Sequence, residues 1–275
     1  MNYYNKNYII YLFLTLISFV IFVPLYWTFI TSLKPPTEIF TKEILYWPKT
    51  PTLENYVYLV TSYPFGRQLM NSAFVSGLSS FFAVIIASFA AYSFSRFAFK
   101  GRRQLLSIVL IFSMLPAVLF MIPYFDIMSR LKLLNTYWSL IITYTAGALP
   151  FSVWMQLGYF SSIPKELDES AMIDGCSRRQ VLFKIVFPLA APGIFAAYVF
   201  AFVGSWDEFI LASVLTSSED MRTASVGIWA FIGEHTTEWG PMCAAVISFI
   251  IPVLILFSII QKYIVRGLTA GALKA

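Results

Sequence analysis

Six long apolar runs dominate this chain and leave it few ways to fold. A helix needs about 20 apolar residues to cross the hydrocarbon core of a bilayer. Because backbone polar groups have no water partners there, helices are the form that such runs take. We therefore expect an all-α integral membrane protein with six transmembrane helices, at residues 9–31, 70–95, 105–127, 137–158, 192–215 and 243–264.

The composition agrees with this expectation. Hydrophobic residues make up 59% of the chain and charged residues 12%, about half of the charged share in soluble proteins. The first run is too long for the apolar part of a signal peptide and lacks a cleavage site of small residues after it. We therefore expect it to be retained as a membrane span.

The positive charges predict the orientation of the spans, because cytoplasmic loops are enriched in Lys and Arg. If both termini are cytosolic, twelve of the 19 basic residues fall on the inner side. The net charge of +5 is then explained by this inner rim, and no nucleic-acid partner is needed. These inner residues are Lys6, Arg96, Lys100, Arg102, Arg103, Lys165, Arg178, Arg179, Lys184, Lys262, Arg266 and Lys274.

Residues 163–192, between the fourth and fifth runs, have the pattern of two short helices joined by a tight turn. Pro164 suits the first turn of a helix, and the acidic residues after it favour the positive end of the helix dipole. Gly175 is expected to end this helix, since glycine accepts a left-handed backbone. Ser177 and Gln180 have the spacing of a capping box for a second helix, which should end at Pro188.

An apolar stripe at Ile163, Leu167 and Ala171, beside several carboxylates, is typical of a helix that docks into a groove of another protein. The alternative is an amphipathic connector that lies on the lipid surface. The carboxylates argue against contact with anionic lipid.

This segment resembles the cytoplasmic loop of ABC importer permease subunits. The loop signature E-A-A, G, I-x-L-P matches Glu169-Ser170-Ala171, Gly175 and Ile185 to Pro188, with Ser170 and Phe187 as the two departures. The resemblance implies that the loop is the coupling helix, which docks on an ATP-hydrolysing subunit. The residues that it implies for coupling are Glu169, Ser170, Ala171, Asp174, Gly175, Ile185 and Pro188.

Other motifs are similar to the sugar-importer branch of that family. Residues 32–36 and the loop that follows, with Trp47-Pro48 and Asn55-Tyr56, resemble its first external loop, which we expect to be ordered. The C-terminal text G-L-T-A-G-A-L-K resembles the tail of the maltose-type smaller permease, which implies docking on the ATPases through Gly267, Gly271 and Lys274.

A third motif, Trp206-Asp207-Glu208-Phe209, resembles the W-N-E-F of sugar-importer permeases. Carboxylates in an apolar run are costly, so we expect them to face a polar interior or the outer mouth, as candidate pathway residues. A hydrolase with paired carboxylates is disfavoured, because adjacent residues on a helix point about 100° apart. The single histidine, His235, is not enough for a metal site.

Small residues and helix breakers suggest how the spans pack. Two lines of small residues predict that the second span packs closely inside the bundle. Spans three and four are interrupted by Pro116, Pro123, Gly147 and Pro150. Such bends either help a span to line a pathway or are ordinary kinks without a role in transport. The two lines are Ser72, Ser76 and Ser80, and Ala83, Ala87 and Ala91. The loosely assigned pathway residues are Met114, Phe120, Met121, Tyr124, Tyr144 and Trp154.

The resemblance implies a type I ABC importer permease fold in the plasma (inner) membrane. It places a first helix and external loop at 1–68, a permease core at 69–264 with its coupling loop at 159–191, and a cytosolic tail at 265–275. The implied partners are a second homologous permease, two ATP-binding subunits and an extracytoplasmic solute-binding protein, with no cofactor on this chain. No G-x-x-x-x-G-K-[ST] is present, so ATP would be hydrolysed by the partners.

The implied activity is uptake of a sugar, such as an oligosaccharide, by alternating access. Two alternatives stay open from the sequence. One is an ion-coupled secondary carrier that uses Asp207 or Glu208, although no Lys or Arg within a span pairs with them. The other is an ABC permease for glycerol-phosphate, because such permeases share these sequence motifs.

Overall fold

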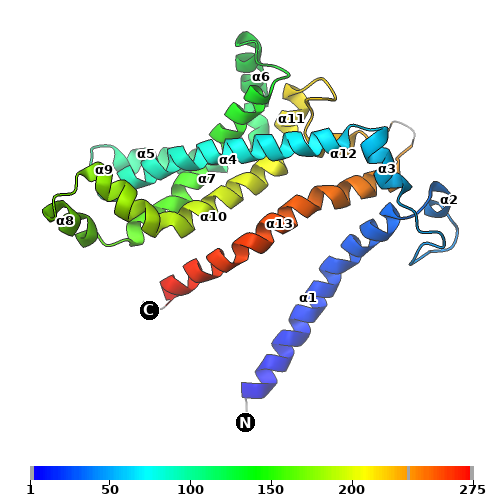
Figure 1. Cartoon of the computed structure of the whole chain (residues 1–275), viewed down its shortest axis with the longest axis horizontal. Coiled ribbons are helices and arrows are strands. Elements are labelled where there is room, and N and C mark those ends of the chain that lie inside the picture. The colour runs from blue at the N-terminus through cyan, green and yellow to red at the C-terminus, as the bar shows by residue number, and fades with distance from the viewer. Residues whose placement is uncertain (1–2, 234–235, 273–275) are drawn as a thin grey trace. The chain divides into compact units, whose positions relative to one another are not determined.

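The computed structural model describes residues 3–233 and 236–272, and the regular structure of these residues is helical (Figure 1). An antiparallel bridge joins Ile232 and Thr237. The elements are α1 (Tyr3–Ser32), α2 (Pro36–Ile39), α3 (Glu54–Thr61), α4 (Phe65–Arg96), α5 (Arg102–Met114), the 3₁₀ turn η1 (Ala117–Phe120), α6 (Met121–Arg130), α7 (Tyr137–Ser162), α8 (Glu166–Ile173), α9 (Arg178–Val181), the π turn η2 (Leu182–Val186), α10 (Phe187–Trp206), α11 (Ile210–Leu215), α12 (Ala224–Trp229) and α13 (Trp239–Ala272).

The chain forms two compact units. The first contains residues 1–67 and 227–252, and the second contains residues 68–226 and 253–275. The site described below is built entirely by the second unit.

Within the described residues, five helical stretches are long and apolar enough to cross a membrane. They are Ile10–Ser32, Phe65–Arg96, Tyr137–Ser162, Arg178–Trp206 and Trp239–Ser258. The expected third span is instead a helix pair, Arg102–Met114 and Ala117–Arg130, bent by 98°. The bend falls at Pro116, where proline removes a backbone donor and fixes its own φ. Pro123 and Pro150 lie within α6 and α7, which continue through them.

The prediction for the fifth span, 192–215, was wrong at both ends. The helical stretch begins at Arg178 and ends at Trp206, and α11 is a separate short helix. Pro188 does not end the second short helix, because the wide π turn η2 lies just before it and Pro188 falls in the first turn of α10.

The small residues of α4 form the packing face that the sequence predicted. Ser72, Ser76 and Ser80 are at most 1% exposed, and Ala83, Ala87 and Ala91 are fully buried. Such residues let helix backbones approach closely, which is how membrane helices pack.

Polar side chains also join α4 to α7 inside the second unit. The Ser88 hydroxyl donates to Gln156 Oε1 at 2.7 Å, and Gln156 Nε2 donates to the Val84 carbonyl. Gln156 is fully buried. Its amide is thus satisfied within the bundle, as a polar group in lipid requires.

The contact between α7 and α10 has a close approach at Gly193. A Cβ on this residue would lie 2.2 Å from Cγ and 2.7 Å from Cβ of Tyr159. Only glycine therefore fits here without a shift of one helix. Helices α7 and α10 lie alongside α4 in Figure 1, and these three helices form the body of the second unit.

In the first unit, the loop after α1 is ordered, as predicted. Asn55 Nδ2 donates to the carbonyls of Ser32 and Lys34, and Lys34 Nζ donates to the Leu45 carbonyl. A Cβ on Gly240 would lie 2.7 Å from Asn55 Oδ1, so this glycine admits the Asn55 side chain. The motifs around Ser32, Asn55 and Trp239-Gly240 thus form one packed structure.

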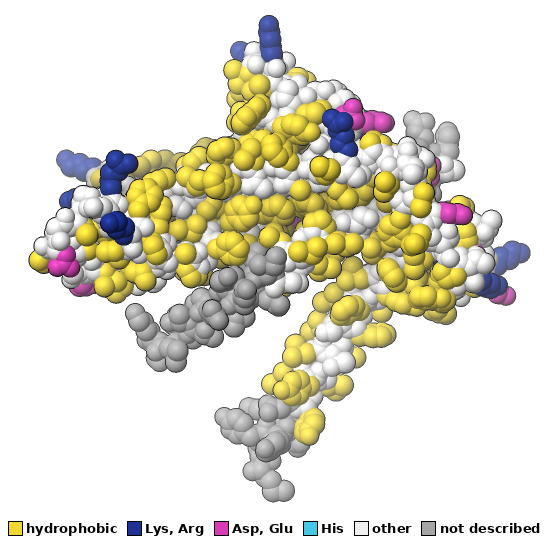
Figure 2. All heavy atoms as spheres, viewed as in Figure 1, with side chains coloured by type: hydrophobic (Ala, Val, Ile, Leu, Met, Phe, Trp, Pro, Cys, Tyr) yellow, Lys and Arg dark blue, Asp and Glu magenta, His cyan; other side chains and the backbone are white. Residues whose placement is uncertain are grey.

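Helix α1 has no buried residue in its most apolar stretch. Figure 2 shows hydrophobic side chains along its visible length. An apolar surface of this extent is typical of contact with lipid or with another membrane subunit. Lys and Arg side chains gather instead at the end of the second unit where α8 and α9 lie (Figure 2).

Candidate functional site

The candidate site is the pair of short helices α8 and α9 at one end of the second unit. Helix α8 begins at Glu166, one residue after the N-cap Lys165, and has Glu166, Asp168 and Glu169 in its first turn. Their negative charge stabilises the N-terminal end of the helix. Pro164 precedes the helix instead of occupying its first turn, which corrects the prediction by two residues.

Gly175 ends α8 as predicted, in the left-handed conformation with φ +88°. The Cys176 amide donates to the Ala171 carbonyl at 2.9 Å, and the Gly175 amide donates to the Met172 carbonyl at 3.1 Å. This pair of bonds is a Schellman motif, which satisfies the last carbonyls of a helix. A Cβ on Gly175 would meet nothing within 4 Å, so the backbone conformation alone requires glycine.

The predicted capping box is present at the start of α9. Ser177 Oγ accepts a hydrogen bond from the backbone N–H of Gln180, and Gln180 Oε1 accepts one from the backbone N–H of Ser177 at 2.7 Å. From there the chain continues through η2 into α10 without a break. A displacement of α9 therefore acts directly on a membrane-spanning helix.

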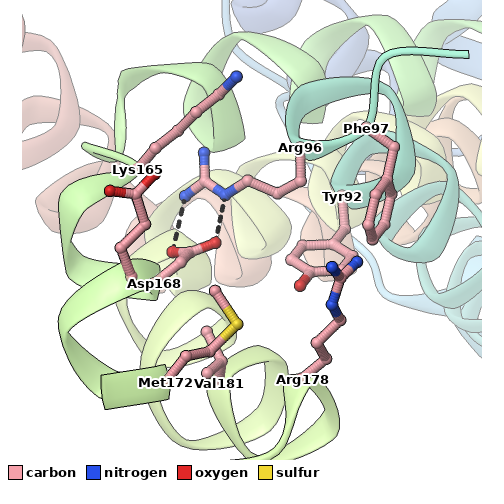
Figure 3. Close-up of a pocket in the computed structure, with 9 residues that line it drawn as sticks. Tyr92, Arg96, Phe97, Lys165, Asp168, Met172, Arg178 and Val181 are labelled. Carbon is pink, nitrogen blue, oxygen red and sulfur yellow. Dashed lines mark hydrogen bonds and ion pairs between the residues drawn. The ribbon is translucent and has the colours of Figure 1, made fainter. Parts of the chain in front are cut away.

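Arg96, the last residue of α4, holds α8 in place (Figure 3). Its Nε and Nη2 donate to the two carboxylate oxygens of Asp168 at 2.7 and 3.3 Å. Its Nη1 donates to the carbonyls of Phe160 and Ile163, at the end of α7 and just after it. The side chains of Arg96 and Asp168 are only 6% and 11% exposed, so this ion pair is well shielded from water.

Sequence reasoning assigned Asp168 only to the helix dipole and Arg96 only to the inner rim. The two residues are 72 positions apart, and no local pattern links them. A near-buried carboxylate needs such a partner, because burying an unpaired charge is costly.

A pocket of about 170 Å³ lies beside this ion pair. Figure 3 shows Arg178 of α9 next to the ring of Phe97, and the guanidinium carbon lies 5.4 Å from the ring centre. A cation over an aromatic face is attracted to it. Thus α9, like α8, is attached to the C-terminal end of α4.

The residues expected to couple lie on two sides of α8. Ala171 is buried with Phe160, Ile163, Val181 and Val186 in one cluster, and Ile185 packs against it. Glu169, Ser170, Asp174 and Gly175 are exposed, as is Pro188. The α8–α9 pair thus has an inner side that is packed and an outer side that is free for contact.

The predicted apolar stripe of α8 is only partly correct. Ile163 and Ala171 are buried, but Leu167 is 43% exposed, because Asp168 takes the inward position beside Arg96. Ile173 is 86% exposed and Met172 is 41% exposed. Three exposed apolar side chains therefore lie beside an exposed carboxylate on α8. We call these exposed residues the α8 face: Leu167, Glu169, Ser170, Met172 and Ile173, of which Glu169 and Met172 also line the pocket beside Arg96.

The four candidate pathway residues lie just where α10 ends and α11 begins. Trp206 is 1% exposed, Asp207 is exposed, and Phe209 packs against a core cluster with Leu211 and Leu215. The Glu208 carboxylate accepts from the amides of Leu211 and Ala212 at 2.8 and 3.0 Å. Glu208 thus caps α11, a role that the sequence pattern did not reveal.

Two of the three C-terminal docking candidates lie within the described residues. Gly267 and Gly271 lie within α13, which continues to Ala272. The expected sixth span, 243–264, is therefore followed by further helix. Lys274 and His235 lie outside the described residues.

Comparison with known proteins places this geometry in a family. Residues 83–270 match the family described as "Binding-protein-dependent transport system inner membrane component". The matched region includes Arg96, α8, α9 and the whole of α10.

Two relatives match over nearly the full length. One is the sulfoquinovosyl glycerol transport system permease protein SmoH of Agrobacterium fabrum, 43% identical over 91% of this chain and 88% of the relative. Another is the trehalose/maltose transport system permease protein MalG of Thermococcus litoralis, 39% identical over 94% of each chain.

A chain in the crystal structure of a bacterial ABC transporter that imports the acidic polysaccharide alginate has the same fold. The TM-score is 0.81 at 22% identity, over 94% of this chain and 96% of the other. Family model, relatives and fold agree, so the chain belongs to the binding-protein-dependent transport system inner membrane components.

Proposed function

We propose that this chain is a permease subunit of an ATP-driven ABC importer that moves a sugar into the cytosol by alternating access. The two relatives above are named for transport of a sugar or a sugar glycoside. Another, of Streptomyces coelicolor, is named for diacetylchitobiose uptake and is 33% identical over 91% of this chain. These names support a carbohydrate as the cargo.

The observation that carries the proposal is that the α8 face is exposed while α8 itself is tied to the bundle. Ile173, Met172 and Leu167 offer apolar contact on a short helix, and Glu169 adds a charge that fixes orientation. A partner that holds such a helix in a groove gains affinity from the apolar side chains. We propose that the partner is an ATP-hydrolysing subunit, as in the importers of this family.

The proposed transmission runs through two connections. Arg96 joins α8 to the ends of α4 and α7 through four hydrogen bonds. The Schellman turn at Gly175 and the capping box join α8 to α9 and thus to α10. When ATP closes the partner subunits, movement of α8 reaches three membrane helices together. The energy that biases the two states comes from ATP bound by the partners.

The proposed assembly contains a second homologous permease, two ATP-binding subunits and an extracytoplasmic solute-binding protein. One support is the crystal structure of a bacterial alginate ABC transporter in complex with a periplasmic protein, in which a chain matches 94% of this one with a TM-score of 0.66. In this assembly, both termini and the α8–α9 pair face the cytosol. Residues 265–275 would then be available to the ATP-binding subunits through Gly267, Gly271 and Lys274.

Substitutions on the α8 face test the proposal. Glu169→Lys and Ile173→Asp should abolish co-purification of the ATP-binding subunits while membrane insertion stays normal. Glu43→Lys and Ile44→Asp make the same changes on exposed residues of the loop after α1 and serve as controls. Normal co-purification and uptake in both α8 variants would contradict the proposal.

An ion-coupled carrier would use Asp207 or Glu208 without ATP. Uptake is therefore measured with an ATP-binding subunit that cannot hydrolyse ATP, while the proton gradient is intact. We expect uptake to be abolished. Persistent uptake would favour the ion-coupled carrier.

A further inference from the structure

A second cavity, of about 330 Å³, opens on the surface of the second unit among η1, α7, α10 and α11, and its lining residues Phe151 and Phe200 are 43% and 50% exposed. This volume falls within the range of about 300 to 1,000 Å³ that is usual for small-molecule sites. Most of its lining is apolar or aromatic, and a few polar groups converge in it. That combination is typical of ligand sites.

Two aromatic rings form part of the wall. Phe151 of α7 and Phe200 of α10 have ring centres 5.8 Å apart at an angle of 63°. Both side chains line the cavity. Aromatic faces provide rigid apolar area against which the C–H side of a pyranose ring packs.

Tyr144 supplies a polar group beside the Glu208 carboxylate. Its side chain is 4% exposed and lines the cavity. The hydroxyl lies near the Glu208 carboxylate, yet it forms no well-oriented hydrogen bond to any described residue. Because a phenol hydroxyl both donates and accepts, a ligand hydroxyl in the cavity would donate to Tyr144 while Glu208 stays within its reach.

Glu208 is the charged residue in the lining of the cavity. The amides of Leu211 and Ala212 fix the position of both of its oxygens. Each carboxylate oxygen accepts more than one hydrogen bond, so both retain capacity for a ligand. A carboxylate accepts from sugar hydroxyls and repels anions.

The rest of the lining decides the charge of the ligand. None of the described residues that line the cavity is Lys, Arg or His. A sulfonate, phosphate or carboxylate group would thus meet the Glu208 charge at short range, without a compensating cation. We propose that this cavity is a transport-path site for a neutral, hydroxyl-rich sugar, held by Tyr144, Glu208 and the Phe151–Phe200 wall.

This inference rests on the proposed function and narrows its cargo. It excludes glycerol-phosphate and acidic sugars as ligands of this cavity. Sulfoquinovosyl glycerol, named in one relative, carries a sulfonate and would be excluded as well.

Cysteine protection in membranes that contain the complete importer tests the site directly. Gly204 lines the cavity, and a Cβ there would meet nothing within 4 Å, so Gly204→Cys places a thiol at the wall. Gly158→Cys is the matched control, because that glycine is equally open but does not line the cavity. Cys176 and Cys243 are first replaced by Ser in both variants.

We expect maltose, trehalose or diacetylchitobiose to slow alkylation of Gly204→Cys at least threefold and to leave Gly158→Cys unaffected. Sulfoquinovosyl glycerol and glycerol 3-phosphate should not protect either thiol. Tyr144→Phe should weaken the protection of Gly204→Cys by neutral sugars, because it removes a hydroxyl that a sugar hydroxyl contacts and keeps the ring.

Protection by an anionic compound, or by none of the three neutral sugars, would overturn the inference. ATP-dependent uptake is measured on the same membranes. Uptake without protection would remove the site and leave the proposed function standing. Protection without any dependence of uptake on ATP would support the site and contradict the proposed function.

Discussion

The Arg96 guanidinium binds the Asp168 carboxylate at two points, with Nε 2.7 Å from Oδ2 and Nη2 3.3 Å from Oδ1. The two residues belong to α4 and α8. A two-point contact fixes orientation as well as distance. The short helix α8 is therefore held at a set angle to a membrane-spanning helix, which is what transmission of a mechanical movement requires.

Loss of Arg96 should destabilise the second unit. Arg96→Met leaves the shielded Asp168 charge without a partner, and removing one member of a buried pair costs about 3 to 5 kcal/mol. We expect a lower unfolding temperature in detergent and reduced uptake. Asp126→Asn is the control, since its pair with Arg130 is exposed and worth at most about 1 kcal/mol. Equal effects of both variants would contradict the structural role of Arg96.

Substitution at Gly175 should separate insertion from coupling. A left-handed backbone costs a residue with a Cβ about 1 to 2 kcal/mol, and Asn tolerates it better than most. We expect Gly175→Val to insert normally, to lose uptake and to increase hydrogen exchange in α8 and α9. Gly175→Asn should keep most of the uptake. If Val and Asn behaved alike, the requirement for positive φ would be refuted.

The close approach of α10 to α7 predicts that Gly193→Ala is destabilising. The new Cβ would overlap the Tyr159 side chain near its attachment to the backbone, so a helix must shift. Overpacking of this kind costs about 1 to 3 kcal/mol. Thermal unfolding of Gly204→Ala, in the same helix but with open space at its Cβ, is the comparison. We expect a clear loss of stability for Gly193→Ala only.

The loop after α1 should loosen in acid. The Thr50 hydroxyl and the amides of Lys49 and Thr50 donate to the Glu38 carboxylate, which lowers its pKa below the ordinary value of 4.5. A depressed carboxyl pKa adds stability above pH 4.5 that is lost as the pH falls through the folded-state pKa. Hydrogen exchange of residues 36–50 against pH measures this loss. In Thr50→Val the folded-state pKa of Glu38 should lie closer to 4.5, so the total loss should be smaller and complete at higher pH. An unchanged profile would exclude the Thr50 contact as its cause.

Local sequence patterns predicted the features that depend on local backbone chemistry. Gly175 and the pair Ser177 and Gln180 act within a few residues of themselves, so spacing alone identifies their roles. The small residues of α4 were predicted for a similar reason, since helical periodicity places them on one face.

Features that depend on tertiary contacts were missed. Asp168 displaces Leu167 from the inner side of α8 because its partner, Arg96, comes from another helix. The cavity beside Tyr144 and Glu208 arises only when α7, α10 and α11 pack together. The resemblance to a permease family identified the coupling loop and the Trp206–Phe209 motif, but it did not predict which residues contact them.

The π turn at Leu182–Val186 sets the angular phase of α10. Each residue in an α-helix advances the direction of its side chain by about 100°. Deleting one residue within this turn would rotate every position beyond it relative to α8 and α9. Gly193 would then point away from Tyr159, and the wall formed by Phe200 and Gly204 would turn from the cavity. The extra residue in this wide turn thus sets how the α8–α9 pair at one end of the helical stretch is aligned with the cavity wall at the other.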